Sequence, residues 1–411
     1  MTQTTPLRMP ITNVFSQGDY TVTLHLGSEN SPVNLILDTG SSTLVVKNDS
    51  YQAAQDKNLQ ASAIVQEVNY GIGGWNGPVI YTRINIHEHN HTSEHPQKIA
   101  EVPSITLNKA PVALVHSTKQ CKTFGNSDGI LGLAYHHLNK SFDFSHYFTE
   151  NKINPPLSYP WPFDEAQSED LGSFKKLMWK YPEQDVTPYF TLLEEQKLSA
   201  NKFSFYSKRS AIHIDIDNTD KTPASDLAKD PLNQGLLILG GGEEQADLYQ
   251  GDFQSIKVEH DVYYNVALTS VQVGTSNPIK AAPLTQQHIK GYFTNAIIDT
   301  GAAGIVLTAE IYQQVISDLS AIHSKFSQYL APFKELSAQL TGIDANELDL
   351  SQWPTLYFTF ISKPATTNSA EITEVLACPP QMYWQINTPN YGKACFRLLS
   401  QLPQWPNQSI I

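Results

Sequence analysis

Charged residues are scarce in this sequence, and cysteine is scarcer still. Only 16% of its 411 residues are charged, against roughly 25% in average soluble proteins. Ser, Thr, Asn, Gln and aromatic residues take their place, and these suit pleated strands and loops better than long exposed helices. An apolar share of 40% supports substantial cores. The composition therefore predicts an all-β or β-rich fold, with length for two or three domains.

Positive charge is also in short supply. Lys and Arg number 27 against 40 Asp and Glu, which gives a formal net charge of −13. Such a surface repels nucleic acids and anionic membranes, so neither is expected as a partner. No apolar run approaches the roughly 20 residues that cross a bilayer. Residues 1–15 also lack the continuous apolar stretch of a signal peptide.

The three cysteines, Cys121, Cys378 and Cys395, are a sparse and odd set for a secreted protein. We therefore predict a cytoplasmic protein, in which Cys378 and Cys395 pair only if the fold brings them together. Residues 87–91 place a histidine at every second position, on one face of an extended strand. We interpret this segment as a solvated hairpin end, because no second ligand cluster with zinc spacing accompanies it. No metal and no cofactor are predicted.

Apolar alternation and turn residues divide the chain into strands, an insertion and a helix. Strands are predicted within 10–47, and a hairpin over 64–86 surrounds a glycine-rich tip. Residues 139–185 are rich in Pro and aromatics and predict an insertion on the surface of a lobe. Its role is open between a gate, a partner site and surface filler. Residues 309–330 predict one helix with an apolar stripe of Ile311, Val315, Leu319 and Ile322.

One segment of the chain is repeated. Residues 35–46 read LILDTGSSTLVV, and residues 296–307 read AIIDTGAAGIVL. Each copy is an apolar strand, Asp-Thr-Gly, two small residues, one spacer and a second apolar strand. The plain alternative is a pair of tight turns, in which the Asp accepts backbone N–H bonds and the Gly supplies an unusual φ. Two copies in matching apolar frames are much harder to obtain by chance than one.

The flanking strands give the two carboxylates, Asp38 and Asp299, a specific chemistry. A carboxylate between buried strands is costly to desolvate unless hydrogen bonds satisfy it. If a pseudo-two-fold axis brings the pair together, both cannot ionise, and they share one proton. The ionised partner then polarises a water as general base, while the protonated one donates to a carbonyl. This arrangement predicts direct attack of water on an amide, without a covalent intermediate.

At these residues the chain resembles the pepsin-like aspartic proteases. Further segments match that family in order: residues 70–77 (YGIGGWNG) resemble its flap, and residues 127–135 (SDGILGLAY) resemble its apolar-apolar-Gly element. Residues 187–206, 236–241 and 263–266 also follow its pattern. The resemblance implies an all-β, bilobal fold with pseudo-two-fold symmetry, with lobes at 1–200 and 201–411. It also implies a monomeric endopeptidase that takes peptide or protein substrates, binds pepstatin-type inhibitors and prefers hydrophobic residues at the cleaved bond.

Residue by residue, the resemblance makes Asp38 and Asp299 the catalytic dyad and places the hydroxyl of Ser41 on the first carboxylate. It implies a second group that lines the substrate backbone, namely Gly40, Gly301, Tyr70, Gly71 and Ile72. It implies an apolar pocket formed by Ile36 and Ile130, for which core packing is the open alternative.

The sequence departs from the family at several places. Ala302 follows the second Asp-Thr-Gly where many members carry Ser or Thr. A missing hydroxyl removes a hydrogen bond that favours the ionised carboxylate, so we predict a dyad that titrates higher and an optimum nearer neutrality. Val45 stands where the family often has a Trp that supports the flap tyrosine. The first Asp lies close to the start, and cysteines are absent from the family's usual disulfide positions. We therefore expect a bacterial-type, unprocessed member.

The end of the chain departs as well. It stops at residues 407–411, about where a second apolar-apolar-Gly element begins in the family, so the last strands of the C-terminal lobe are expected to be absent. This leaves an alternative open: a catalytically inactive peptide-binding protein, or a truncated fragment, in place of an active endopeptidase.

Overall fold

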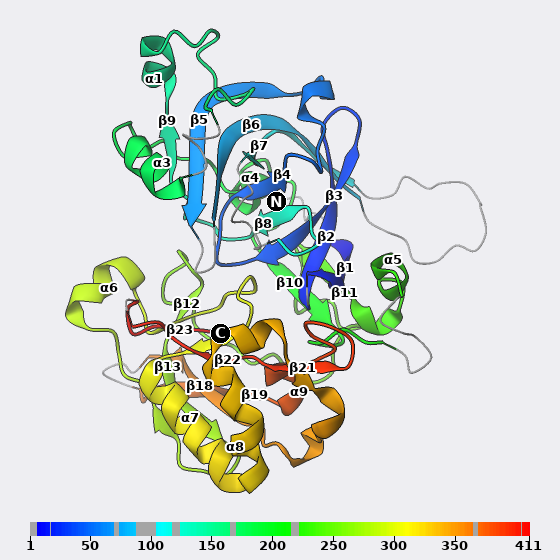
Figure 1. Cartoon of the computed structure of the whole chain (residues 1–411), viewed down its shortest axis with the longest axis vertical. Helices are drawn as coiled ribbons and strands as arrows, with labels where there is room; N and C mark the ends of the chain where they lie inside the picture. Colours follow the sequence, from blue (N-terminus) through cyan, green and yellow to red (C-terminus); the bar gives the residue numbers. More distant parts are fainter. Residues whose placement is uncertain are drawn as a thin grey trace. The chain divides into compact units, whose positions relative to one another are not determined.

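The computed structural model describes residues 6–16, 18–69, 74–87, 104–116, 124–164, 170–214, 222–364, 369–403 and 405–411. The described chain divides into two compact units, which Figure 1 colours along the sequence. The N-terminal unit comprises Met1–Ser16, Tyr20–Tyr206 and Gly235–Leu248; the C-terminal unit comprises Gln17–Asp19, Ser207–Gln234 and Tyr249–Ile411. The boundary predicted at residue 200 differs from this division, because two strands beyond it return to the N-terminal sheet.

The N-terminal unit is built on one large sheet. In the part of the chain that the structure describes, its order is β10-β11-β1-β2-β3-β8-β4-β7-β6-β5-β9, with a further pairing of β2 with β6. The strands are β1 (Leu7–Ser16), β2 (Asp19–Leu26), β3 (Ser31–Asp38), β4 (Leu44–Lys47), β5 (Gln60–Asn69), β6 (Gly74–His87), β7 (Ser104–Val115), β8 (Gly129–Gly132), β9 (Ser141–Asp143), β10 (Phe203–Ser207) and β11 (Gln234–Leu239). Alternate side chains along these strands are buried, as in Leu7, Met9 and Ile11 of β1.

Short helices accompany this sheet. They are η1 (Ala53–Gln55), α1 (Ser145–Glu150), α3 (Leu171–Met178) and α4 (Tyr189–Glu195). The predicted insertion at 139–185 contains β9, α1 and α3, which lie beside β5 in Figure 1. Val65 of β5 belongs to an apolar cluster otherwise supplied by the insertion: Phe142, Phe144, Phe148, Phe163, Phe174 and Met178. The insertion therefore has its own aromatic core and packs on the flap hairpin.

The C-terminal unit contains three smaller sheets among its described residues: β12-β15-β23-β16-β22, β14-β13-β18-β19 and β17-β21-β20. The strands are β12 (Asn265–Val266), β13 (Leu268–Val273), β14 (Ile279–Lys280), β15 (Ala296–Ile297), β16 (Ile305–Leu307), β17 (Ile343–Asp344), β18 (Leu356–Lys363), β19 (Ile372–Cys378), β20 (Trp384–Ile386), β21 (Lys393–Phe396), β22 (Leu398–Ser400) and β23 (Ser409–Ile410). One apolar cluster, which includes Val271, Phe358, Trp384 and Phe396, packs these sheets together.

Several helices belong to this unit. They are α5 (Ala224–Leu227), η2 (Pro231–Asn233), α6 (Gln286–Tyr292), α7 (Ala309–Ile322), α8 (Ser324–Leu330), η3 (Ala331–Lys334), η4 (Leu336–Leu340), η5 (Ala345–Glu347), η6 (Leu350–Gln352) and α9 (Pro380–Tyr383). The prediction of a single helix over 309–330 is wrong, because the helix is interrupted at His323. His323 has an extended backbone, with φ −148° and ψ 132°, and its Nδ1 accepts a hydrogen bond from the N–H of Lys325. Ile311, Val315 and Leu319 are buried as predicted, whereas Ile322 is exposed beside the break.

Some predictions fall on residues outside the described parts of the chain. These are the flap residues Tyr70, Gly71 and Ile72, the cysteine Cys121 and the histidines His89 and His91. Cys378 and Cys395 are described, and both are buried free thiols. Burial raises the pKa of each thiol, that of Cys378 to about 12. In the described chain, no helix has the length and apolarity needed to span a membrane.

Candidate active site

Asp38 is the last residue of β3, where an apolar strand turns into the Asp-Thr-Gly loop. Its side chain is buried, with 6% of its surface exposed. The N–H of Gly40 donates to Oδ1 at 2.8 Å, and the hydroxyl of Ser41 donates to Oδ2 at 2.5 Å. Each carboxylate oxygen thus has a donor, which offsets part of the cost of burying the group. The predicted placement of the Ser41 hydroxyl on this carboxylate is therefore present.

Strand β8 runs behind this loop. It pairs in parallel with β3, so that Asp38 lies opposite Gly132, and antiparallel with β4. A side chain at Gly132 would lie 2.6 Å from the backbone of Ser42 and Thr43, which explains the glycine in GILG. The N–H groups of Gly132 and Ala134 donate to the carbonyls of Thr43 and Ser41. The carbonyl side of the loop is thereby held by main-chain hydrogen bonds.

Asp299 occupies the corresponding place in the C-terminal unit, two residues after β15. The N–H of Gly301 donates to its Oδ1 at 2.9 Å, as Gly40 does to Asp38. The next residue is Ala302, which has no hydroxyl to place where Ser41 stands. Beyond it, the N–H of Ile305 donates to the carbonyl of Arg397 at 2.8 Å. The two loops share the glycine contact and differ in the residues that follow it.

The last strand of the chain, β23, completes the likeness. It lies between β15 and β16, parallel to the first and antiparallel to the second, as β8 does between β3 and β4. Ser409 lies opposite Ala296, three residues before Asp299. Gly129 lies opposite Leu35, three residues before Asp38. Residues 409–411 therefore have the position and register of the residues that begin the apolar-apolar-Gly element of the N-terminal unit.

The two isoleucines predicted for an apolar pocket are cross-strand partners. Ile36 of β3 lies opposite Ile130 of β8, and they are 4% and 3% exposed. They belong to one apolar cluster with Val45, Trp75, Val79, Ala113, Val115, Phe124 and Val186. Core packing, the alternative reading for this pair, describes their surroundings. The cluster also receives a fully buried tryptophan, Trp75, although the sequence has Val45 at the family's tryptophan position.

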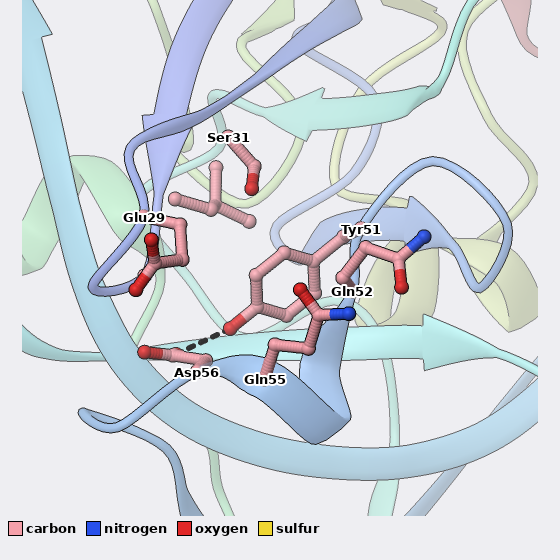
Figure 2. Close-up of a pocket in the computed structure, with 8 residues that line it drawn as sticks. Glu29, Ser31, Tyr51, Gln52, Gln55 and Asp56 are labelled. Carbon is pink, nitrogen blue, oxygen red and sulfur yellow. Dashed lines mark hydrogen bonds between the residues drawn. The ribbon is translucent and has the colours of Figure 1, made fainter.

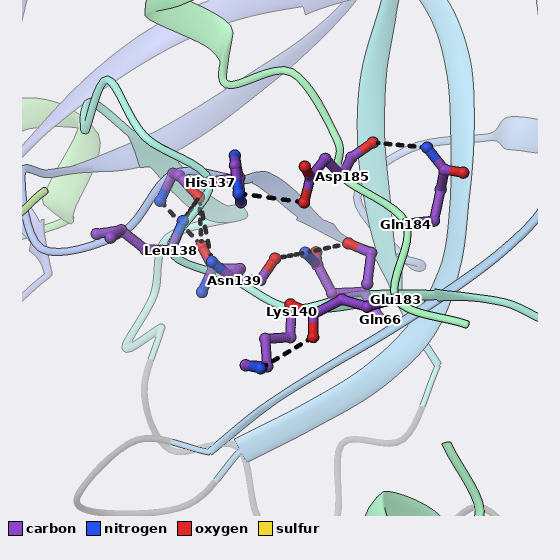
Figure 3. A network of polar contacts seen from close by, with 10 residues as sticks. Gln66, His137, Leu138, Asn139, Lys140, Glu183, Gln184 and Asp185 are labelled. Carbon is purple, nitrogen blue, oxygen red and sulfur yellow. Dashed lines mark hydrogen bonds and ion pairs between the residues drawn. The ribbon is translucent and has the colours of Figure 1, made fainter. Parts of the chain in front are cut away.

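A polar network that the sequence did not predict holds the other side of the Asp38 loop (Figure 3). The side-chain carbonyl of Asn139 accepts from the N–H of Ser42 at 2.9 Å and from the N–H of Thr43 at 3.2 Å. The side-chain amide of Gln66, on β5, donates to Thr43 Oγ1, to the carbonyl of Asn139 and to Ser141 Oγ. These are ordinary polar residues of the flap strand and of the insertion, and no local motif marks them.

A buried carboxylate that the sequence did not predict lies on β5. Glu67 is 6% exposed, and its Oε1 has no hydrogen-bond partner among the described residues. It pairs across the hairpin with Asn76. Burial raises the pKa of Glu67 to about 7, although the positive charge of Lys175 on α3 opposes this shift. The group therefore ionises near neutrality and is costly to charge where it lies.

A further carboxylate, the half-buried Asp56, has a structural setting (Figure 2). It accepts hydrogen bonds from the hydroxyls of Tyr51 and Thr82 and from the N–H of Ser28 and Asn58. Burial alone would raise the pKa of Asp56, but these hydrogen bonds outweigh it and lower the pKa. A cavity of about 40 Å³ adjoins it. Its donors satisfy the carboxylate fully, so it offers no base for catalysis.

Within the described chain, no group of three His, Cys, Asp or Glu side chains could hold a metal ion. In each repeated loop, the Asp accepts a hydrogen bond from the N–H of the glycine two residues later.

Two β-rich units, each with an Asp-Thr-Gly loop backed by a parallel strand, define a pepsin-like aspartic protease fold. The comparison with protein families agrees: the eukaryotic aspartyl protease family matches residues 19–157 and 224–386. These segments cover most of the chain and include both Asp-Thr-Gly loops. The chain belongs to this family.

Similar proteins are distant in sequence. The vacuolar aspartic protease of Candida albicans is 21% identical over 331 residues, which cover 78% of this chain and 58% of that protein. The beta-secretase of Strongylocentrotus purpuratus is 19% identical over 318 residues, which cover 74% of this chain and 46% of that protein. The chain spans about half the length of these curated relatives.

Proposed function

We propose that the chain acts as an aspartic endopeptidase in which Asp38 and Asp299 together activate a water molecule. One observation carries the proposal: both carboxylates have the same local setting. Asp38 ends β3 and Asp299 follows β15 by two residues; each accepts the N–H of the second residue after it at 2.8 or 2.9 Å, and the strand before each is paired with a parallel strand in the same register. Tight turns of unrelated purpose have no reason to share both features.

The proposed chemistry needs only these two groups, water and a peptide. With one proton shared between two carboxylates, the ionised one accepts a proton from water as its oxygen attacks the peptide carbonyl carbon. The protonated one donates to the carbonyl oxygen, which gives a neutral tetrahedral diol. The peptide nitrogen then takes the proton held by the first carboxyl group, a hydroxyl of the diol gives its proton to the second carboxylate, and the C–N bond breaks to release an acid and an amine. The dyad is then back in its starting state. No bond to the enzyme forms.

The proposed substrate is an extended peptide with apolar side chains at the cleaved bond. Gly40 and Gly301 carry no side chains beside the carboxylates, which supports recognition of peptide backbone. The preference for apolar side chains rests on the family resemblance alone, because Ile36 and Ile130 lie in a buried apolar cluster. Pepstatin-type inhibitors, which are themselves extended apolar peptides, are expected to compete.

The pH optimum is proposed to lie between neutral and mildly acidic. The support is the difference between Ser41, whose hydroxyl donates to Asp38, and Ala302, which has none to give Asp299. A carboxylate with fewer donors to its ionised form titrates higher. We also propose that the protein is a monomer, as the family resemblance implies, and that it lies in the cytoplasm. The free thiols Cys378 and Cys395 support a reducing compartment.

Incubation of the full chain with a peptide library, followed by mass spectrometry, tests the proposal. We expect cleavage between apolar residues, inhibition by a pepstatin-type compound, and no transfer of the acyl group to added hydroxylamine, because no acyl-enzyme forms. Hydroxamate products would contradict the mechanism. Binding of the peptides and the inhibitor without any turnover would select the alternative, a peptide-binding protein of the same fold.

A further inference from the structure

The backbone of the Asp38 loop is held from two sides. On one side, the carbonyls of Ser41 and Thr43 accept N–H bonds from the chain that continues β8, at 3.0 and 3.1 Å. On the other side, the N–H groups of Ser42 and Thr43 both point at one atom, the side-chain oxygen of Asn139. The hydroxyls of Ser42 and Thr43 lie 3.2 Å from the same oxygen. The backbone N–H groups of Ser42 and Thr43 are therefore both bound by one side chain, that of Asn139.

The contact between Asn139 and the loop is reciprocal. Ser42 Oγ accepts from the N–H of Leu138 at 2.8 Å and from the N–H of Asn139 at 3.2 Å. In the other direction, the backbone N–H groups of Ser42 and Thr43 can only donate. The side chain at position 139 must therefore present an acceptor to them. Ser42 and Thr43 are 4% and 6% exposed, and water has little access to replace that acceptor.

The corresponding loop of the C-terminal unit is held differently. Ala303 and Gly304 stand where Ser42 and Thr43 stand, and neither has a hydroxyl. A side chain at Gly304 would lie 2.6 Å from the carbonyl oxygen of Arg397, which also accepts the N–H of Ile305. The two hydroxyls that contact Asn139 therefore have no counterpart at positions 303 and 304.

Asn139 itself is tied to both ends of the insertion (Figure 3). Next to it, Lys140 forms an ion pair with Glu183 at 3.0 Å. His137 Nε2 lies 3.1 Å from a carboxylate oxygen of Asp185. The carbonyl of Asn139 accepts from Gln66 on the flap strand at 3.1 Å. These contacts join the start and end of the insertion at the point where Asn139 reaches the loop.

We propose that Asn139 is a positioning residue for catalysis: its side-chain carbonyl holds the Ser42–Thr43 turn so that the hydroxyl of Ser41 stays on the carboxylate of Asp38. Through the same residue, the insertion at 139–185 supports the Asp38 loop. Ser41 directly precedes this turn, and its bond to Oδ2 of Asp38 depends on where the turn lies. The inference rests on the proposed peptidase function for its kinetic consequence, but its structural consequence does not.

Two substitutions of similar size separate the acceptor from mere bulk. Asn139→Asp keeps an oxygen for the two N–H groups, whereas Asn139→Leu removes it. In full-chain protein we expect Asn139→Leu to lower kcat by about 10- to 100-fold, the scale of a small displacement of catalytic groups, with KM changed less than about twofold. The acidic limb of the kcat/KM profile of Asn139→Leu should move to higher pH, because the hydrogen bond from Ser41 to Asp38 weakens. Asn139→Asp should retain kcat within about threefold. Asn151→Leu, at an exposed position of the insertion whose side-chain amide donates to the carbonyl of Tyr147, is the control.

A readout independent of activity accompanies these kinetics. Hydrogen exchange of peptide fragments spanning residues 39–46 should accelerate in Asn139→Leu and stay near the wild-type rate in Asn139→Asp. Equal exchange in both variants would overturn the positioning role, whatever the enzyme does. Faster exchange with unchanged kcat and pH profile would also overturn it, because the contact would then be structural only. An inactive wild-type protein with this exchange pattern would instead count against the proposed function and leave the loop contact established.

Discussion

The hydroxyl of Ser41 donates a 2.5 Å hydrogen bond to Oδ2 of the Asp38 carboxylate. Its length lies within the range of about 2.5–2.7 Å for a hydroxyl that donates to a charged acceptor. It is made between two buried side chains, where water cannot substitute for it. In the other unit, Ala302 stands at the corresponding position. This difference between the two halves determines the first two predictions.

Ser41→Ala should move the acidic limb of the kcat/KM profile to higher pH. Loss of a donor to the ionised form raises the pKa of a carboxylate, and a hydrogen bond to a charged group corresponds to about one to two pH units. The pH dependence of kcat/KM measures the shift. Ser173→Ala is a matched control, because Ser173 donates a 2.6 Å bond to Asp170 on the exposed surface. Identical profiles for the two variants would contradict the role of Ser41.

Ala302→Thr should have the opposite effect. A new hydroxyl beside Asp299 can donate to its ionised form and lower its pKa, so the optimum should move toward acid. The same pH profile measures it, with Ala303→Ser as the neighbouring control. If the wild-type profile already peaks at as low a pH as that of Ala302→Thr, the explanation of a near-neutral optimum by Ala302 is wrong.

Glu67→Gln should flatten the pH dependence of thermal stability. The pKa of Glu67 is raised by burial to about 7 in the folded chain, above its ordinary value of 4.5. The folded state therefore binds a proton that the unfolded state releases, so this contribution to stability is full below pH 4.5 and is lost as the pH rises through about 7. Gln keeps the shape and does not ionise.

Melting temperatures between pH 4.5 and 8 check this expectation. The wild-type Tm should fall over that range by more than the Tm of Glu67→Gln, which should be the more stable protein at pH 8. Glu195→Gln, at an exposed end of α4, should behave as wild type. Parallel curves for wild type and Glu67→Gln would show that Glu67 is already ionised at no cost in the folded state.

Gly27→Ala should destabilise the N-terminal unit for two separable reasons. Gly27 has φ of +74°, a conformation that costs most side chains about 1–2 kcal/mol. A Cβ there would also lie 2.8 Å from Cγ of the hydrogen-bonded Asp56. Gly125→Ala carries the first cost alone, because φ is +51° and the nearest atom is 3.5 Å away. Chemical denaturation of both variants should show the larger loss for Gly27→Ala; equal losses would mean that Asp56 moves aside freely.

The repeated loops could be predicted from sequence because their signal is local. Asp-Thr-Gly between two apolar strands specifies the strand end, the turn and the glycine N–H on the carboxylate, and both Asp38 and Asp299 have that geometry. Strand alternation likewise indicated the hairpin of β5 and β6. The family resemblance added the placement of Ser41, which no composition or periodicity specifies.

The other features of the fold and of the site depend on contacts between residues that are far apart in the sequence, or on a break that no local pattern marks. Asn139 meets Ser42 from 97 positions away, and neither residue looks unusual in its own surroundings. The boundary at 200 failed for the same reason, because β10 and β11 join the sheet of β1 by long-range pairing. The break at His323 has no Gly or Pro to mark it; an extended residue whose side chain accepts from Lys325 ends one helix and begins the next.

The catalytic pair is the central claim, and the activity of single carboxamide variants tests it most directly. Asp38→Asn and Asp299→Asn each keep the size of the side chain and remove one proton-sharing partner. We predict that each lowers kcat/KM for a peptide cut by the wild type by about 10²- to 10⁴-fold, with Tm close to wild type. Undiminished cleavage by either folded variant would contradict the account.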